Sequence, residues 1–127
     1  MQGQPADYRT SMLHCEGWWE QSECGRQPML DLMIQVAGGR ITGFGDDMIG
    51  PFTFNGTLSE TGHVAMIKQY IGQHKVYYVG SYDGEGTMWG HWRLAFGCGR
   101  WLITIRRGRA ERADTAAIQE LVPMACQ

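Results

Sequence analysis

The sequence lacks the segments that direct a protein into a membrane or out of the cell. Its first fifteen residues, MQGQPADYRTSMLHC, have no basic region followed by an apolar core, so they do not have the form of a signal peptide. No apolar run approaches the length of a transmembrane helix. We therefore expect a cytoplasmic protein, unless a leader precedes the sequence.

Recognisable metal and redox motifs are also missing. The four cysteines, Cys15, Cys24, Cys98 and Cys126, include no Cys-x-x-Cys pair, so we interpret them as free thiols in a reducing compartment. A Cys15–Cys24 disulfide is the alternative in an oxidising one. The histidines show neither HExxH nor i,i+2 spacing, so we expect no metal and no cofactor, and His91 is interpreted as a surface or hydrogen-bonded residue rather than a ligand.

Excess charge of one sign is absent as well. Thirteen acidic and eleven basic residues give a net charge of −2, so no strong field attracts nucleic acid or an anionic membrane. A basic cluster lies near the C-terminus, but acidic residues are interleaved with it, which favours a solvated helix with ion pairs over a nucleic-acid site. The cluster consists of Arg100, Arg106, Arg107, Arg109 and Arg112.

What the sequence does have is many short apolar runs separated by its 18 glycines. Alternating polar and apolar residues predict strands. We expect eight of them, near residues 16–23, 29–37, 40–45, 51–57, 64–70, 76–82, 87–96 and 100–107, and then a helix over 110–122. Because the connections are short, neighbouring strands should be antiparallel. The pattern predicts an all-β domain over residues 1–127, an eight-stranded antiparallel up-and-down barrel with a C-terminal α-helix, in preference to a sandwich.

The alternation also predicts which side chains point into the barrel. The residues expected inside are apolar or aromatic and come from six of the strands: Trp19, Leu30, Leu32, Ile34, Phe52, Phe54, Tyr78, Trp92, Leu94 and Ile103.

Strands 64–70 and 76–82 form the central hairpin, and Lys68 lies among its apolar and aromatic residues. Since strands alternate in direction, Asp46, Asp47, Tyr70 and His74 should share one mouth of the barrel, with Lys68 just below it. Two interpretations of Lys68 remain: a solvated lysine on the outside, or the polar centre of a pocket with Asp46 or Asp47 as its partner.

Two short motifs resemble those of calycins, the superfamily of lipocalins, fatty-acid-binding proteins and avidins. Gly17-x-Trp19 is similar to the Gly-x-Trp that opens the first lipocalin strand near the closed end. Arg106 or Arg107 would correspond to the basic residue that packs over this tryptophan. The resemblance implies a ligand-binding barrel, but the avidin biotin-binding pattern does not map. A series that includes Gly43-x-Gly45-x-Asp47 and Lys68-x-Tyr70 also resembles small uncharacterised bacterial barrel domains.

Three functions fit these observations. The first is binding of a small, partly apolar molecule at the mouth, with Lys68 suited to an anionic head group. The second is an isomerase or hydro-lyase with Asp47 and Lys68 or Tyr78 as acid and base. The third is a structural or interaction domain with a filled barrel. The candidate ligand-binding residues are Lys68, Tyr70, Tyr78, Trp92, Asp46, Asp47 and His74; the Asp46-Asp47 pair would otherwise satisfy loop amides.

The last three strands are apolar on both faces. Tyr77, Val79, Trp89 and Leu102 alternate with the residues expected inside, and a barrel buries only one face in its own core. We therefore expect a homodimer or higher homo-oligomer through these strands. The alternative is that the predicted C-terminal helix covers them.

Overall fold

The computed structural model describes residues 12–106, which form eight strands and no helix. The strands are β1 (Leu13–Gln21), β2 (Gly25–Ala37), β3 (Arg40–Asp46), β4 (Pro51–Leu58), β5 (His63–Tyr70), β6 (Lys75–Tyr82), β7 (Thr87–Leu94) and β8 (Gly97–Ile105). They make one closed antiparallel barrel in sequence order, so the predicted all-β up-and-down barrel is confirmed. The helix predicted over 110–122 lies outside the described residues. Within those residues no helix has the length and apolar character needed to cross a membrane.

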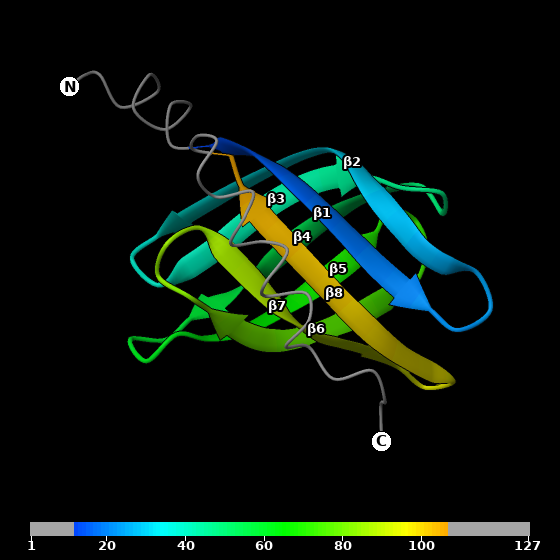
Figure 1. Ribbon diagram of the computed structural model, residues 1–127. Helices are drawn as coiled ribbons and strands as arrows, with labels where there is room; N and C mark the ends of the chain where they lie inside the picture. Colours follow the sequence, from blue (N-terminus) through cyan, green and yellow to red (C-terminus); the bar gives the residue numbers. More distant parts are fainter. Residues whose placement is uncertain (1–11, 107–127) are drawn as a thin grey trace.

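Short turns and one terminal pairing close the ring. Gly38 and Gly39 both have positive φ, 60° and 79°, which the two-residue turn between β2 and β3 requires. Figure 1 shows β1 and β8 running side by side across the front of the barrel. Their antiparallel ladder runs from the Cys15–Ile105 pair to the Trp19–Trp101 pair. No edge strand therefore remains exposed in the described barrel.

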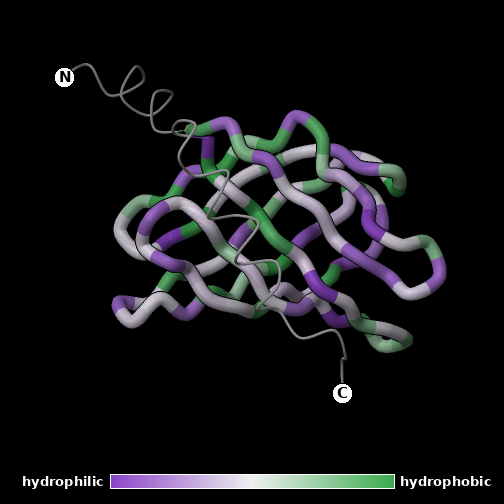
Figure 2. Tube along the Cα trace, viewed as in Figure 1, coloured by the Kyte–Doolittle hydropathy of each residue, from purple (hydrophilic) through white to green (hydrophobic). Residues whose placement is uncertain are grey.

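The interior is filled by its own side chains. Along the tube in Figure 2, polar and apolar residues alternate over short distances, as a barrel with one buried face requires. Gly80 and Gly90 lie opposite each other on β6 and β7, and Trp101 of β8 follows in the same row. A Cβ on either glycine would lie 1.9 Å from a backbone oxygen of the neighbouring strand. This close approach lets the fully buried Trp101 indole donate to the Val79 carbonyl at 3.2 Å.

Most of the residues predicted to point inward are buried. Trp19, Leu32, Ile34, Phe52, Phe54, Tyr78, Trp92 and Ile103 belong to the core, and Leu94 packs against it half-buried. The prediction for Leu30 is wrong, because its side chain is 53% exposed and Met29 is buried instead. The β2–β3 register shifts between Leu30 and Met33, and Asp31 within this bulge has a φ of 51°. The bulge changes which face each residue occupies, and simple alternation does not reveal it.

The arrangement implied by the calycin resemblance around Gly17-x-Trp19 is also not observed. β1 begins at Leu13, so Gly17 lies in mid-strand and Trp19 lies near the mouth. Arg106 forms an ion pair with Glu16 at 2.9 Å instead of packing over Trp19, and Arg107 lies outside the described residues. The eight-stranded closed antiparallel barrel itself is compatible with a calycin-like fold.

Candidate functional site

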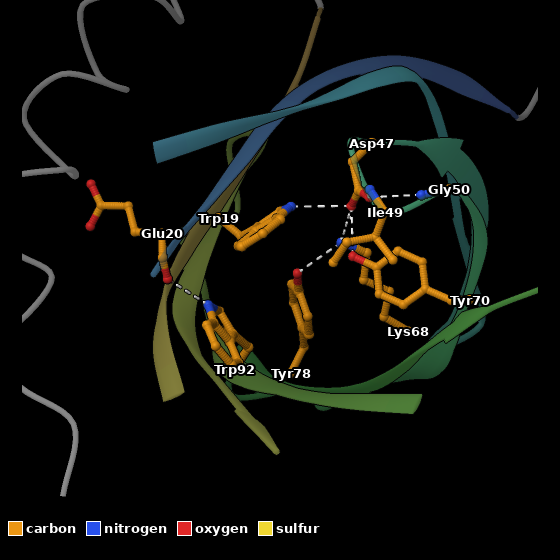
Figure 3. A network of polar contacts seen from close by, with 9 residues as sticks. All are labelled: Trp19, Glu20, Asp47, Ile49, Gly50, Lys68, Tyr70, Tyr78 and Trp92. Atoms are coloured by element: carbon orange, nitrogen blue, oxygen red, sulfur yellow. Dashed lines mark hydrogen bonds and ion pairs between the residues drawn. The ribbon is translucent and has the colours of Figure 1, made fainter. Parts of the chain in front are cut away.

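Asp47, in the loop after β3, is the centre of a buried polar cluster at the mouth of the barrel (Figure 3). Three side chains donate hydrogen bonds to its Oδ2 atom: the Trp19 indole at 3.1 Å, the Lys68 ammonium at 2.7 Å and the Tyr70 hydroxyl at 2.7 Å. These donors come from β1 and β5, so one carboxylate joins three parts of the chain. We call Asp47, Lys68, Trp19, Tyr70 and Tyr78 the Asp47 cluster.

The other oxygen of Asp47 holds its own loop. Oδ1 accepts hydrogen bonds from the amides of Ile49 at 2.9 Å and Gly50 at 3.4 Å, and the Asp47 amide donates to the Gly50 carbonyl at 3.2 Å. An aspartate that satisfies amides two and three residues ahead is a common turn element. Both suggested roles of the aspartate pair, loop support and lysine partner, are therefore performed by Asp47.

Lys68 lies inside the barrel and is fully buried. Its ammonium donates to Asp47 and, at 3.2 Å, to the hydroxyl of Tyr78. The nearest aromatic ring is that of Phe52, whose centroid lies 4.3 Å from Nζ, and the Tyr70 ring lies at 4.9 Å. A carboxylate and several ring faces therefore replace the water lost on burial.

The protonation states of the cluster follow from burial and from this pairing. Burial lowers the pKa of Lys68 to about 8, against the raising effect of the bonded Asp47 carboxylate. Burial by itself would raise the pKa of Asp47, but the hydrogen bond and charge of Lys68 outweigh it and lower that pKa. Burial raises the pKa of both Tyr70 and Tyr78. At neutral pH the cluster is an ion pair flanked by two neutral phenols.

A small pocket opens above this cluster. It has a volume of about 50 Å³ and is lined by Trp19, Gln21, Ile49, Tyr70, His74, Val76, Tyr78, Trp92 and Leu94. We call it the mouth pocket. The Trp92 indole donates to the Glu20 carbonyl at 2.9 Å, and its ring meets that of Trp19 edge to face, with centroids 6.2 Å apart. Seven of the nine lining side chains are apolar or aromatic, so the pocket suits an apolar group.

The structure brings most of the predicted site residues together, but not all in the predicted role. Tyr70, His74, Tyr78 and Trp92 line the mouth pocket. Lys68 is inside the barrel, as one of its two interpretations predicted, yet it lies behind the pocket and does not line it.

Of the two aspartates, Asp47 forms the ion pair with Lys68. Asp46 is exposed and pairs through the β-ladder with Pro51. Trp19 and Ile49 were not among the predicted site residues. For Trp19 the sequence did contain a usable signal, because this residue was predicted to point inward from a strand that ends at the mouth.

The other potentially reactive groups of the described chain are weaker candidates for a functional site. Cys15, Cys24 and Cys98 are free thiols, so the Cys15–Cys24 disulfide is absent, and burial raises the pKa of Cys15 to about 12. Within residues 12–106, no group of three His, Cys, Asp or Glu side chains converges to hold a metal ion. His91 is half-buried, and its Nε2 atom has no hydrogen-bond partner in the described barrel.

Comparison with known proteins adds no assignment: no family model, no curated protein and no solved structure matches this chain.

Proposed function

We propose that this protein is a non-enzymatic barrel that binds one end of a small, largely apolar molecule in the mouth pocket. The observation that carries the proposal is the lining, in which Trp19, Trp92 and Tyr78 surround an opening at the end of an otherwise filled barrel. Binding sites are typically apolar and carry a few polar groups that orient the ligand. His74 and Gln21 supply polar groups among the lining residues.

The position of Lys68 argues against an anionic head group. Its ammonium is 2.7 Å from the Asp47 carboxylate and does not line the pocket. An anion bound there would have to displace a buried carboxylate that already has five donors. The charge of Lys68 therefore stabilises the buried Asp47 carboxylate and is not placed to bind a ligand.

The same geometry weakens the case for acid–base catalysis. The oxygens of Asp47 are occupied by hydrogen bonds, and burial raises the pKa of Tyr78 well above its usual value, so neither group is poised to exchange protons near neutral pH. Lys68, whose pKa burial lowers to about 8, does not line the mouth pocket and is bonded to Asp47. A solid structural barrel is the stronger competitor. The pocket volume of about 50 Å³ is well below the roughly 300–1,000 Å³ of typical ligand sites, so only part of a ligand would be enclosed.

Titration with acetophenone, a flat uncharged probe, separates binding from a solid barrel. We expect the probe to shift the indole N–H resonances of Trp19 and Trp92 at millimolar concentration. Leu94→Phe should narrow the pocket and weaken this response. Ile71→Phe is the matched control, because Ile71 is exposed at the same end of the barrel and does not line the pocket. No shift of either indole would favour the solid barrel.

Two further proposals concern relatives and assembly. The closed eight-stranded antiparallel meander supports a calycin-like fold, and a cytoplasmic location stays a prediction. For assembly, Tyr77 and Val79 of β6 are 55% and 48% exposed, whereas Leu102 of β8 is 1% exposed. A homo-oligomer would therefore use the outer face of β6, and light scattering at high micromolar concentration should show a dimer or larger species. Val79→Glu should then shift the protein from this oligomer to a monomer.

A further inference from the structure

The hydroxyl of Tyr78 has a hydrogen that the described chain does not use. Tyr78 Oη accepts a hydrogen bond from Lys68 Nζ at 3.2 Å. No nitrogen or oxygen of residues 12–106 accepts the hydrogen of Tyr78 itself. Tyr70 offers a contrast within the same cluster, because its hydroxyl donates to Asp47 at 2.7 Å. Of the two phenols, only Tyr78 keeps a free donor.

The residue that carries this donor is one of those that line the mouth pocket. Tyr78 is buried and lines the pocket. Its ring packs against Phe54 and Trp101, with centroid distances of 5.2 Å in both cases. Figure 3 shows its hydroxyl pointing toward the centre of the barrel, between Trp19 and Tyr70. A buried donor without an acceptor is costly, and a bound acceptor would remove that cost.

We infer, on the basis of the proposed function, that the ligand carries an uncharged hydrogen-bond acceptor, a carbonyl oxygen being the simplest, and that Tyr78 donates to it. The class is an apolar ketone, ester or tertiary amide whose carbonyl end enters the mouth pocket. Its apolar part would contact Trp19 and Trp92, which line the same pocket.

The electrostatics of the Asp47 cluster favour an uncharged acceptor. Lys68 and Asp47 neutralise each other at 2.7 Å, so the floor of the pocket has no net charge to attract an ion. A cationic donor would find the Asp47 oxygens already occupied by side chains and loop amides. Since burial raises the pKa of Tyr78, its hydrogen remains in place at and well above neutral pH.

Three probes of nearly the same flat shape test this inference: acetophenone, α-methylstyrene and benzoate. α-Methylstyrene replaces the carbonyl oxygen by a methylene group, and benzoate adds a negative charge. Their affinities are measured by NMR titration for the wild type, Tyr78→Phe and Tyr77→Phe. Tyr77 lies on the same strand with an exposed side chain, so Tyr77→Phe controls for the loss of a hydroxyl alone.

We expect Tyr78→Phe to weaken acetophenone about tenfold, as the loss of one good hydrogen bond does. The affinity for α-methylstyrene should change less than about twofold, and Tyr77→Phe should change neither. In the wild type, the ¹³Cζ resonance of Tyr78 should move with acetophenone and stay in place with α-methylstyrene. This second measurement does not depend on the stability of the variant.

Two kinds of failure are distinguishable. If both uncharged probes bind equally well to the wild type and to Tyr78→Phe, or if benzoate binds best, the acceptor inference is wrong although the pocket still binds ligands. If none of the probes shifts the Trp19 or Trp92 indole resonance, the proposed function fails, and the inference that rests on it fails with it.

Discussion

The Asp47 cluster inside the barrel and the outer face of β1, β8 and β7 differ in how their buried polar groups are satisfied. Inside, Asp47 accepts five hydrogen bonds and Lys68 has two polar partners. On the outer face, three buried atoms have no hydrogen-bond partner among residues 12–106: Trp18 Nε1, Thr87 Oγ1 and His91 Nε2. The ladder pairs bring these residues next to Leu102, Thr104 and Arg100 of β8.

The difference shows which polar groups the described barrel can complete by itself. Residues 12–106 satisfy nearly all of the polar atoms around Asp47. Removing any one partner in the Asp47 cluster should therefore lower the unfolding free energy of the protein. The same residues leave the three outer atoms unsatisfied, so deleting one of those atoms should cost little.

Lys68→Met should produce the largest loss. It leaves the Asp47 carboxylate buried without its cation, which costs on the order of 3 kcal/mol of unfolding free energy. Chemical denaturation measures the change, and Lys75→Met on the same hairpin is the control because Lys75 is exposed. A Lys68→Met loss no greater than that of the control would contradict the description of the cluster.

The double variant with Asp47→Asn should recover part of this loss. Once the carboxylate is neutral, no buried charge is left unpaired, so the two substitutions should be strongly non-additive. Since Asp47 also holds the amides of Ile49 and Gly50, recovery should be incomplete. Strictly additive effects would show that Lys68 and Asp47 are uncoupled.

Raising the pH should stabilise the wild type over a limited interval. The pKa of Lys68 falls from 10.5 to about 8 on burial, so between these values the unfolded chain binds a proton that the native chain has released. The unfolding free energy therefore rises with pH from about 8 to about 9. Above about pH 9 the Cys15 thiol offsets this rise, because burial raises its pKa to about 12 and only the unfolded thiol ionises. Above about pH 10 the unfolding free energy should fall, because burial also raises the pKa of Tyr70 and Tyr78 and only the unfolded phenols ionise. Denaturation midpoints measured at increasing pH should show this maximum in stability. In Lys68→Met the stability should not rise with pH before it falls.

Tyr70→Phe should have an intermediate effect. It removes one charge-assisted hydrogen bond to Asp47 and keeps the ring, which packs against Phe52 at 5.9 Å. Hydrogen bonds to charged groups contribute roughly 1.5–3 kcal/mol, so we expect a loss of about 2 kcal/mol. Tyr77→Phe, which removes an exposed hydroxyl, should be close to neutral in the same denaturation experiment. If Tyr70→Phe and Tyr77→Phe lowered the unfolding free energy equally, the hydrogen bond from Tyr70 to Asp47 would contribute no more than an exposed hydroxyl.

Thr87→Val should have the smallest effect and the opposite sign. Thr87 is fully buried and its hydroxyl has no partner in the part of the chain that the structure describes, so replacing that hydroxyl by a methyl group should remove a desolvation cost. We expect a stability gain of up to about 1 kcal/mol. Thr53→Val on β4 controls for the gain in strand propensity, because Thr53 is only half-buried. A loss above about 1 kcal/mol would mean that the Thr87 hydroxyl has a partner after all.

The sequence was sufficient to predict the barrel and the meeting of Lys68 with a neighbouring aspartate. Both depend on strand alternation and short turns, which determine where each strand end lies. It could not distinguish Asp47 from Asp46, because that choice depends on the backbone of one loop. The exposed position of Leu30 was missed because the Asp31 bulge leaves no periodic signal. The small size of the mouth pocket depends on side-chain packing, which sequence patterns do not describe.

The ladder between β1 and β8 also has a consequence for the order in which the chain can fold during synthesis. All the other strand pairs join neighbours in sequence, whereas this one joins residues about ninety positions apart, such as Cys15 and Ile105. A nascent chain can form the hairpins from β1 to β7 early, but two open edges remain until β8 leaves the ribosome. That final strand also carries Trp101, which fills the space beside Gly90. Closure and core completion should therefore occur in one late, slow step, during which the open edges are most prone to pair with another chain.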